Sequence, residues 1–133
     1  MNILIINGAN AKTSRLTALV NYVHSTLASQ GMQVKTLDVI SIPAEDLILT
    51  KFGSPAIIEA RQLVEEADIL LVATPVYKGS YSGILKTFLD LLPECSLKEK
   101  VCVPTGMGGT MAHLLMLEYT LKPVLSILGS TAI

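Results

Sequence analysis

Short apolar runs alternate with longer amphipathic segments along most of the chain, which is the pattern of repeated strand–helix–strand units. Strands are predicted over residues 2–6, 34–39, 68–74 and 101–104. Helices are predicted over residues 14–30, 54–66, 82–92 and 110–128. In the first of these helices, apolar residues recur mostly at three- and four-residue steps. Residues 41–53 contain a proline and a glycine and are predicted to be mostly connection.

Several helix boundaries carry signals of their own. Gly31 follows the first helix where a C-terminal glycine belongs, and Ser54 with Pro55 supplies a cap and a first-turn proline for the second. Pro123 is expected to bend or interrupt the last helix, because proline lacks the backbone N–H that a helix needs. Four such strands joined by right-handed crossovers predict an α/β fold with a three-layer, doubly wound parallel sheet.

One domain, residues 1–133, is predicted, since no repeat, linker or low-complexity tract divides the chain. The sequence stops at residues 130–133, where a fifth strand would begin, so the sheet is expected to lack its final strand and helix. The edge strand exposed in this way invites pairing with another chain.

Composition supports a buried sheet and excludes several classes of function. Half of the residues are apolar and 16% are charged, which suits a sheet covered on both faces. The net charge of −1 leaves no footprint for nucleic acid and argues against an acidic electron carrier. No apolar run approaches the roughly 18 residues of a membrane span, and the N-terminus lacks the basic region of a signal peptide. A cytoplasmic protein is therefore expected, with Cys95 and Cys102 reduced and buried.

Candidate chemistry lies in the loops after the first, third and fourth strands, because ligands of doubly wound sheets bind beyond the carboxyl ends of the strands. The first loop, residues 7–15, has small residues, hydroxyls and two cations at the start of a helix. Free N–H groups and the helix dipole would make it a phosphate cradle. A plain loop with Thr13 or Ser14 as N-cap is the alternative interpretation.

The second and third loops have compositions suited to a flat heterocycle. Residues 74–83 place two tyrosines among small and hydroxylated residues, which would supply ring faces and a few polar groups. Residues 105–110 hold three glycines in four positions, whose N–H groups would donate to ring carbonyls or nitrogens. A surface turn and a flexible connection are the respective alternatives.

The remaining candidates are weaker. His24 is expected at the surface or partly packed, and His113 either touches a ligand near the third loop or packs. Two histidines so far apart do not make a metal site, and Cys95 has no base nearby that would make it a nucleophile. The methionines near the last helix are interpreted as packing or interface residues, namely Met107, Met111 and Met116.

At these loops the sequence resembles a known family. Residues 73–78, followed by 81–83 and 85–87, look like the flavin-contacting segment of NADPH-dependent FMN reductases, with the greatest similarity to the alkanesulfonate-utilisation type. The agreement continues through residues 43–47, 54–56, 89–93, 108–110, 112–115 and 121–125. The resemblance thus covers essentially the whole chain.

The resemblance implies a flavodoxin-like fold, with FMN phosphate in the first loop and the isoalloxazine ring between the second and third loops. The family usually has Gly-Ser and then an arginine in its first loop, whereas Ala9 follows Gly8 here and Ala11 stands in the arginine position. No catalytic residue and no metal ligand are expected, because the cofactors carry the chemistry. The expected cofactor-binding residues are Lys12, Ser14, Arg15, Pro75, Val76, Tyr77, Lys78, Ser80, Tyr81, Ser82, Gly83, Gly106, Gly108, Gly109 and Thr110.

The function implied is reduction of FMN by NADPH, which supplies reduced flavin to a partner flavin-dependent monooxygenase. Family members assemble as homodimers or homotetramers, and the resemblance places Tyr119 at the tetramer interface. Two alternatives stay open: a quinone or azo reductase that holds FMN tightly, and a non-catalytic FMN-binding module or electron carrier.

Overall fold

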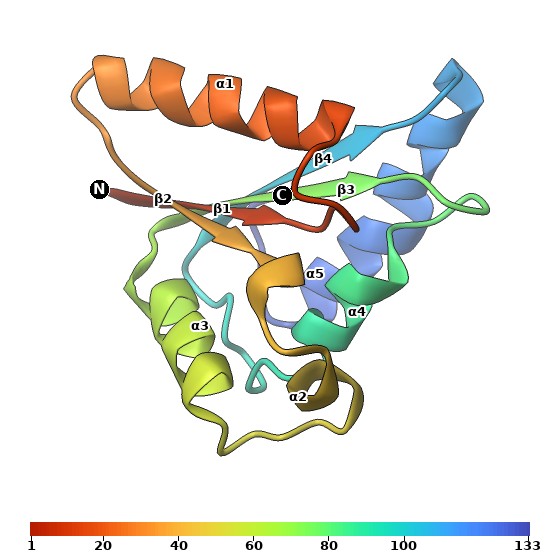
Figure 1. Cartoon of the computed structure of the whole chain (residues 1–133). Coiled ribbons are helices and arrows are strands. Elements are labelled where there is room, and N and C mark those ends of the chain that lie inside the picture. Colours follow the sequence, from red (N-terminus) through yellow and green to blue (C-terminus); the bar gives the residue numbers. More distant parts are fainter.

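One parallel sheet with the strand order β2-β1-β3-β4 forms the centre of the molecule (Figure 1). The computed structural model describes all of residues 1–133. The strands are β1 (Asn2–Asn7), β2 (Gln33–Asp38), β3 (Ile69–Pro75) and β4 (Val101–Met107). In the register, Ile5 of β1 lies between Thr36 of β2 and Leu71 of β3. The predicted doubly wound α/β sheet is confirmed, and its order reverses between β1 and β3, where such sheets bind ligands.

The helices cover the two faces of the sheet unequally. They are α1 (Arg15–Ser29), α2 (Ala44–Ile48), α3 (Pro55–Glu66), α4 (Gly83–Leu89) and α5 (Lys122–Ile127). Figure 1 shows α1 alone on one face and the other four helices on the opposite face.

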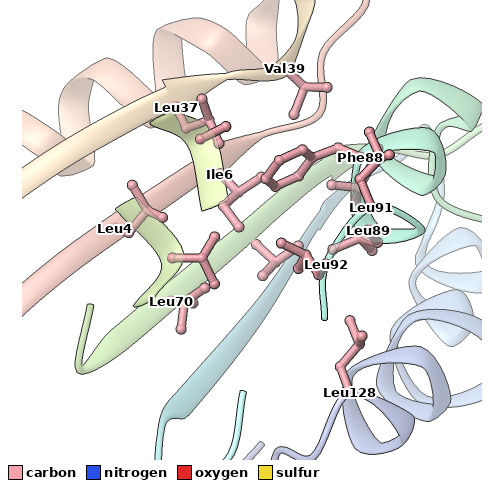
Figure 2. Close-up of a cluster of buried hydrophobic side chains, with 14 of the residues drawn as sticks. Leu4, Ile6, Leu37, Val39, Leu70, Phe88, Leu89, Leu91, Leu92 and Leu128 are labelled. Atoms are coloured by element: carbon pink, nitrogen blue, oxygen red, sulfur yellow. The ribbon is translucent and has the colours of Figure 1, made fainter. Parts of the chain in front are cut away.

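Side chains that alternate along the strands divide the core into two clusters. Leu4, Ile6 and Leu70 point to the face of α2–α5 and belong to a cluster of 23 buried residues (Figure 2). Ile5 points the other way and joins a cluster of five buried residues beneath α1. This alternation is what strand geometry requires, and it anchors both layers to the same strands.

The outer edge of β4 carries the beginning of a fifth strand. Ala132 pairs with Val101 in a parallel bridge, and the N–H of Cys102 donates to the carbonyl of Ala132 at 2.8 Å. On the α1 side of this edge, Val101 and Val103 stay 45% and 43% exposed, because no second helix lies beside α1. Within residues 1–133, Ala132 is the residue that pairs with this edge of β4.

The prediction of a connection over residues 41–53 was wrong in part. A 3-10 turn forms at Val39–Ser41, and α2 follows at Ala44–Ile48. The carbonyl of Pro43 accepts from the N–H groups of Asp46 and Leu47, and Leu47 is buried in the larger cluster. The burial of this leucine stabilises a helix too short to carry a sequence periodicity.

The last predicted helix is helical but not continuous. It consists of a 3-10 turn at Met111–Leu115, a π-helical turn at Leu117–Leu121, and α5. Pro123 lies in the first turn of α5, just after the π-helical turn, in agreement with the predicted interruption. Helix α4 is also shorter than predicted and ends at Leu89.

Strand β4 is longer than predicted, since it continues to Met107 instead of stopping at Pro104. Gly106 pairs with Thr74, and Met107 pairs with Pro75. The neighbouring strand supplies this pairing, so the local sequence with its glycine gives no sign of it. The third loop therefore begins only at Gly108.

Two further expectations need correction. Ser54 precedes α3, but its hydroxyl donates to Asp46 at 2.5 Å instead of capping the helix. Cys95 was expected to be buried and is exposed, on a turn where its φ is +58°. Cys102 is buried as predicted, and that burial raises the pKa of its thiol.

Candidate functional site

The three loops selected from the sequence meet in one crevice beyond the carboxyl ends of β1, β3 and β4. Its volume is about 260 Å³. The crevice is lined by Ala9, Asn10, Ala11, Ser14, Arg15, Leu16, Pro75, Val76, Tyr77, Met107, Gly108 and Gly109. These residues come from all three loops, so the crevice lies where a doubly wound sheet holds its ligand.

Asn7, the last residue of β1, fixes the start of the first loop through its side-chain hydrogen bonds. Its side chain is buried, donates to Thr17 at 3.1 Å and to Asp38 at 2.9 Å, and accepts from the N–H of Ala9 at 3.2 Å. One side chain thereby ties the loop to α1 and to the end of β2. A buried amide with partners on three elements fixes the start of the loop.

The first loop presents unused donors and unpaired cations. The N–H groups of residues 10–14 donate no hydrogen bond within the protein. Lys12 and Arg15 are exposed and belong to no ion pair. The hydroxyl of Ser14 accepts from the N–H of Thr17 at 3.0 Å and caps α1. Free N–H groups at the start of a helix, with two cations beside them, can bind a phosphate.

The second loop is fastened to the first by Ser82. This side chain is fully buried, and its hydroxyl donates to the carbonyl of Gly8 at 2.7 Å and accepts from Leu85 at the start of α4. The N–H of Ser82 donates to the hydroxyl of Thr74 at 2.9 Å. A side chain on Gly8 would meet the carbonyl of Ala73 at 3.0 Å. Ser82 therefore positions the loops and leaves no free group for a ligand.

A tight turn presents Tyr77 at the mouth of the crevice. Tyr77 and Ser80 exchange two backbone hydrogen bonds of 3.0 and 3.1 Å. Lys78 and Gly79 between them have φ values of +51° and +73°, as a type I′ turn requires. Tyr77 is 54% exposed, and its ring is therefore available to cover a bound heterocycle.

The third loop is held close to the second. The N–H of Val76 donates to the carbonyl of Met107 at 3.0 Å. A Cβ on Gly108 would lie 3.4 Å from Val76 and 2.5 Å from the Cβ of His113, so glycine is needed at this position. The N–H groups of Gly108 and Gly109 donate no hydrogen bond within the protein and line the crevice.

The structure brings only some of the expected cofactor-binding residues into the wall of the crevice. Those in the wall are Ser14, Arg15, Pro75, Val76, Tyr77, Gly108 and Gly109. Those outside it are Lys12, Lys78, Ser80, Tyr81, Ser82, Gly83, Gly106 and Thr110. Gly106 lies within β4, where a side chain would meet Leu117 at 3.3 Å.

Sequence reasoning missed five lining residues: Ala9, Asn10, Ala11, Leu16 and Met107. Most of them are small or apolar and carry no chemistry that would select them. Their position within or next to the chosen loops was the available signal.

The groups along the crevice fit FMN. The free N–H groups and Arg15 at one end match a phosphate, and the exposed ring of Tyr77 with Val76 and Met107 offers apolar surface to an isoalloxazine. The free N–H groups of Gly108 and Gly109 match acceptors on the ring. No group of three His, Cys, Asp or Glu side chains could hold a metal ion, and none of the helices has the length and apolar character that would cross a bilayer.

The largest cavity lies elsewhere. It has a volume of about 970 Å³ and lies between α3 and the segment before β4, where Arg61, Cys95 and Lys100 are among its lining residues. Lys100 donates there to two backbone carbonyls, and the acidic side chains of Glu65 and Glu66 offset the cations. By its volume alone, this larger cavity would be the preferred candidate for a ligand site. The smaller crevice combines free donors, an exposed aromatic ring and a strand switch point, and it is the better candidate.

Comparison with known proteins identifies the family of the chain. A family model described as NADPH-dependent FMN reductase matches residues 1–133. An FMN reductase (NADPH) of Pseudomonas putida KT2440 is 46% identical over 128 residues, which cover 96% of this chain and 65% of the relative. An FMN reductase (NADPH) of Escherichia coli K12 is 43% identical over 133 residues. These residues cover 100% of this chain and 70% of the relative.

Among solved structures, the apo form of an NADH:FMN oxidoreductase (EMOB) superposes with a TM-score of 0.89 at 35% identity. The match covers 96% of this chain and 68% of that chain. The chain thus spans about two thirds of the length of the proteins it matches. By its sequence, its flavodoxin-like sheet and the match over its whole length, the chain belongs to the NADPH-dependent FMN reductase family.

Proposed function

We propose that this chain binds FMN in the carboxyl-end crevice and catalyses its reduction by NADPH in the cytoplasm, so that a partner flavin-dependent monooxygenase receives the reduced flavin. The observation that carries the proposal is the meeting of three loops in one crevice, with free N–H groups at both ends and Tyr77 exposed at its mouth. The relatives named as FMN reductases support the same reaction.

Each part of the crevice has a role in this proposal. Arg15, Lys12 and the free N–H groups of the first loop bind the phosphate. Val76, Tyr77 and Met107 contact the ring, and Gly108 with Gly109 donates to its polar edge. Bound FMN supplies the electron-accepting ring, and the protein holds that ring where a nicotinamide can reach it.

The phosphate end of the crevice favours a flavin that is released over one that is held permanently. This end relies on exposed side chains, whose charges water screens. A flavin bound in this way can leave after reduction and reach a monooxygenase.

The test mixes the purified chain with NADPH and free FMN and follows the NADPH absorbance. Oxidation that depends on FMN concentration is the expected result, and NADH in place of NADPH measures the nucleotide preference. Absence of FMN-dependent oxidation would overturn the proposed reaction. Titration of FMN fluorescence separates a released substrate from a tightly held group, as a quinone or azo reductase would hold it.

We also propose that the chain forms a homodimer or homotetramer. Met111, Leu115 and Tyr119 expose apolar surface along the segment after β4, and Val103 does so on the edge strand. Light scattering should give a mass of at least two chains for the wild-type protein. Tyr119→Glu and Val103→Glu locate the contact, and a monomeric wild-type protein would overturn the proposal.

A further inference from the structure

Among the groups that the proposed function leaves unused, His113 has the most specific geometry. Its Nδ1 accepts the N–H of Thr110 at 3.0 Å and lies 3.3 Å from the Thr110 hydroxyl. In return, the N–H of His113 donates to the carbonyl of Thr110 at 3.1 Å. The two residues thus close a reciprocal cap at the start of the 3-10 turn, directly after the glycines of the crevice.

His113 also lies against both glycines. A Cβ on Gly108 would be 2.5 Å from the His113 Cβ, and a Cβ on Gly109 would be 3.7 Å from the Cε1 of the imidazole. On its other side, Gly108 is close to Val76 of the second loop. The imidazole therefore packs on the segment that presents the free N–H groups of Gly108 and Gly109.

The imidazole supplies the side-chain hydrogen bond to the backbone of this turn. Gly108, Gly109 and Thr110 are all exposed, and the hydrogen bond from Thr110 to Nδ1 is the one donated by the N–H groups of these three residues. Glycine is the most flexible residue type, so two in succession require an external constraint.

We propose that His113 is a positioning residue, which accepts the Thr110 N–H and thereby holds the Gly108–Gly109 turn in the conformation that binds the flavin ring. This inference rests on the proposed function, because it concerns the ring end of the same crevice. Its action is indirect: the side chain fixes a backbone segment and leaves contact with the flavin to the glycines.

The variants His113→Asn and His113→Leu separate the acceptor from the volume of the side chain. The Asn Oδ1 occupies the same place along the side chain as Nδ1 and can accept the Thr110 N–H, whereas Leu has a similar size and no acceptor. His24→Leu serves as the matched control, because it removes a histidine whose Nδ1 lies 2.9 Å from the Thr36 hydroxyl, on the β2 side of α1. All four proteins are titrated with FMN and with riboflavin, and exchange of the Thr110 amide hydrogen is followed by NMR without ligand.

His113→Leu should speed exchange of the Thr110 amide hydrogen. It should also weaken the binding of FMN and of riboflavin by the same factor, about fivefold or more, since one hydrogen bond contributes about 1 kcal/mol. The affinity of His113→Asn for both flavins should stay within about threefold of the wild type, and His24→Leu should bind them like the wild type.

Equal losses of affinity in the Asn and Leu variants, or no loss in either, would overturn the inference while the proposed function stands. A loss confined to FMN would also overturn it, because it would place the effect at the phosphate. A wild-type chain that binds neither flavin would overturn the proposed function itself, and the flavin role of His113 with it.

Discussion

The hydroxyl of Ser82 donates a hydrogen bond of 2.7 Å to the carbonyl of Gly8, which lies 74 positions earlier in the sequence. The same hydroxyl accepts from Leu85 and caps α4. A single buried side chain therefore joins the first loop, the second loop and the helix that follows. This joint fixes the first and second loops relative to each other.

Ser82→Ala should lower the free energy of unfolding by about 2 kcal/mol, because it leaves a buried carbonyl unpaired and removes a helix cap. Urea unfolding measures the change. Ser29→Ala is the control, since that exposed hydroxyl bonds only within the last turn of α1, and its effect should stay within about 0.5 kcal/mol. Equal effects from the two substitutions would contradict the role given to Ser82.

Tyr77→Ala should weaken FMN binding about tenfold, because removing an aromatic side chain from the face of the flavin ring costs up to about 1.4 kcal/mol. Tyr22→Ala is a matched control, since Tyr22 is 69% exposed on α1, outside the crevice. Fluorescence titration of both variants gives the comparison. If the two substitutions weaken FMN equally, the ring does not lie beside Tyr77.

Arg15→Gln should weaken FMN binding while leaving riboflavin binding unchanged, because only FMN carries the phosphate. The loss should shrink in high salt, which screens an exposed cation. Lys98→Gln removes an exposed cation outside the crevice and should change neither ligand. Riboflavin affinity that falls together with FMN affinity would place Arg15 at the ring instead of the phosphate.

The two thiols should react at very different rates. Cys95 is exposed on a turn, whereas Cys102 is buried within β4. A thiol reagent should therefore label one cysteine in the folded protein, and Cys95→Ala should abolish that rapid phase. The second thiol should react only after unfolding. Rapid labelling of both thiols in the wild type would contradict the packing around β4.

Burial also predicts a pH dependence of stability through Cys102. Its pKa is raised in the folded state above the ordinary value of 9.0, so the folded chain keeps the thiol proton to higher pH than the unfolded chain does. The thiol therefore leaves stability unchanged well below that value and lowers it as the pH rises beyond it. Urea midpoints at about pH 8 and about pH 10 should show a smaller decline for Cys102→Ala than for Cys95→Ala.

The sequence predicts most of this fold where local pattern and tertiary context agree. The run 68–74 ends at a proline and forms β3 within one residue at each end, and Ser14 caps α1 as its position suggests. Prediction from the local sequence fails where a residue distant in the sequence determines the local structure. Gly106 joins β4 because Thr74 pairs with it, and Leu47 folds into α2 because the core buries it.

For the site, too, local sequence patterns are predictive and contacts between distant residues are not. Loop composition alone locates the crevice, since glycines and tyrosines after parallel strands are a local signal. It cannot tell how a hydroxyl is used within the protein: Ser82 is predicted to bind the cofactor, and only the structure shows that its buried hydroxyl is bonded to the carbonyl of Gly8. Nor does it indicate that His113 bonds to Thr110, because histidine is not the Glu or Gln that usually reaches back from this position to a helix N-cap.

Amide hydrogen exchange with and without FMN tests most directly where the flavin lies. FMN should slow exchange in residues 9–15, 76–81 and 108–110, which belong to the three loops of the small crevice. Exchange should not change around Cys95 and Lys100, which line the larger cavity. Protection around those two residues, with none in the three loops, would contradict the placement of FMN beyond the carboxyl ends of the sheet.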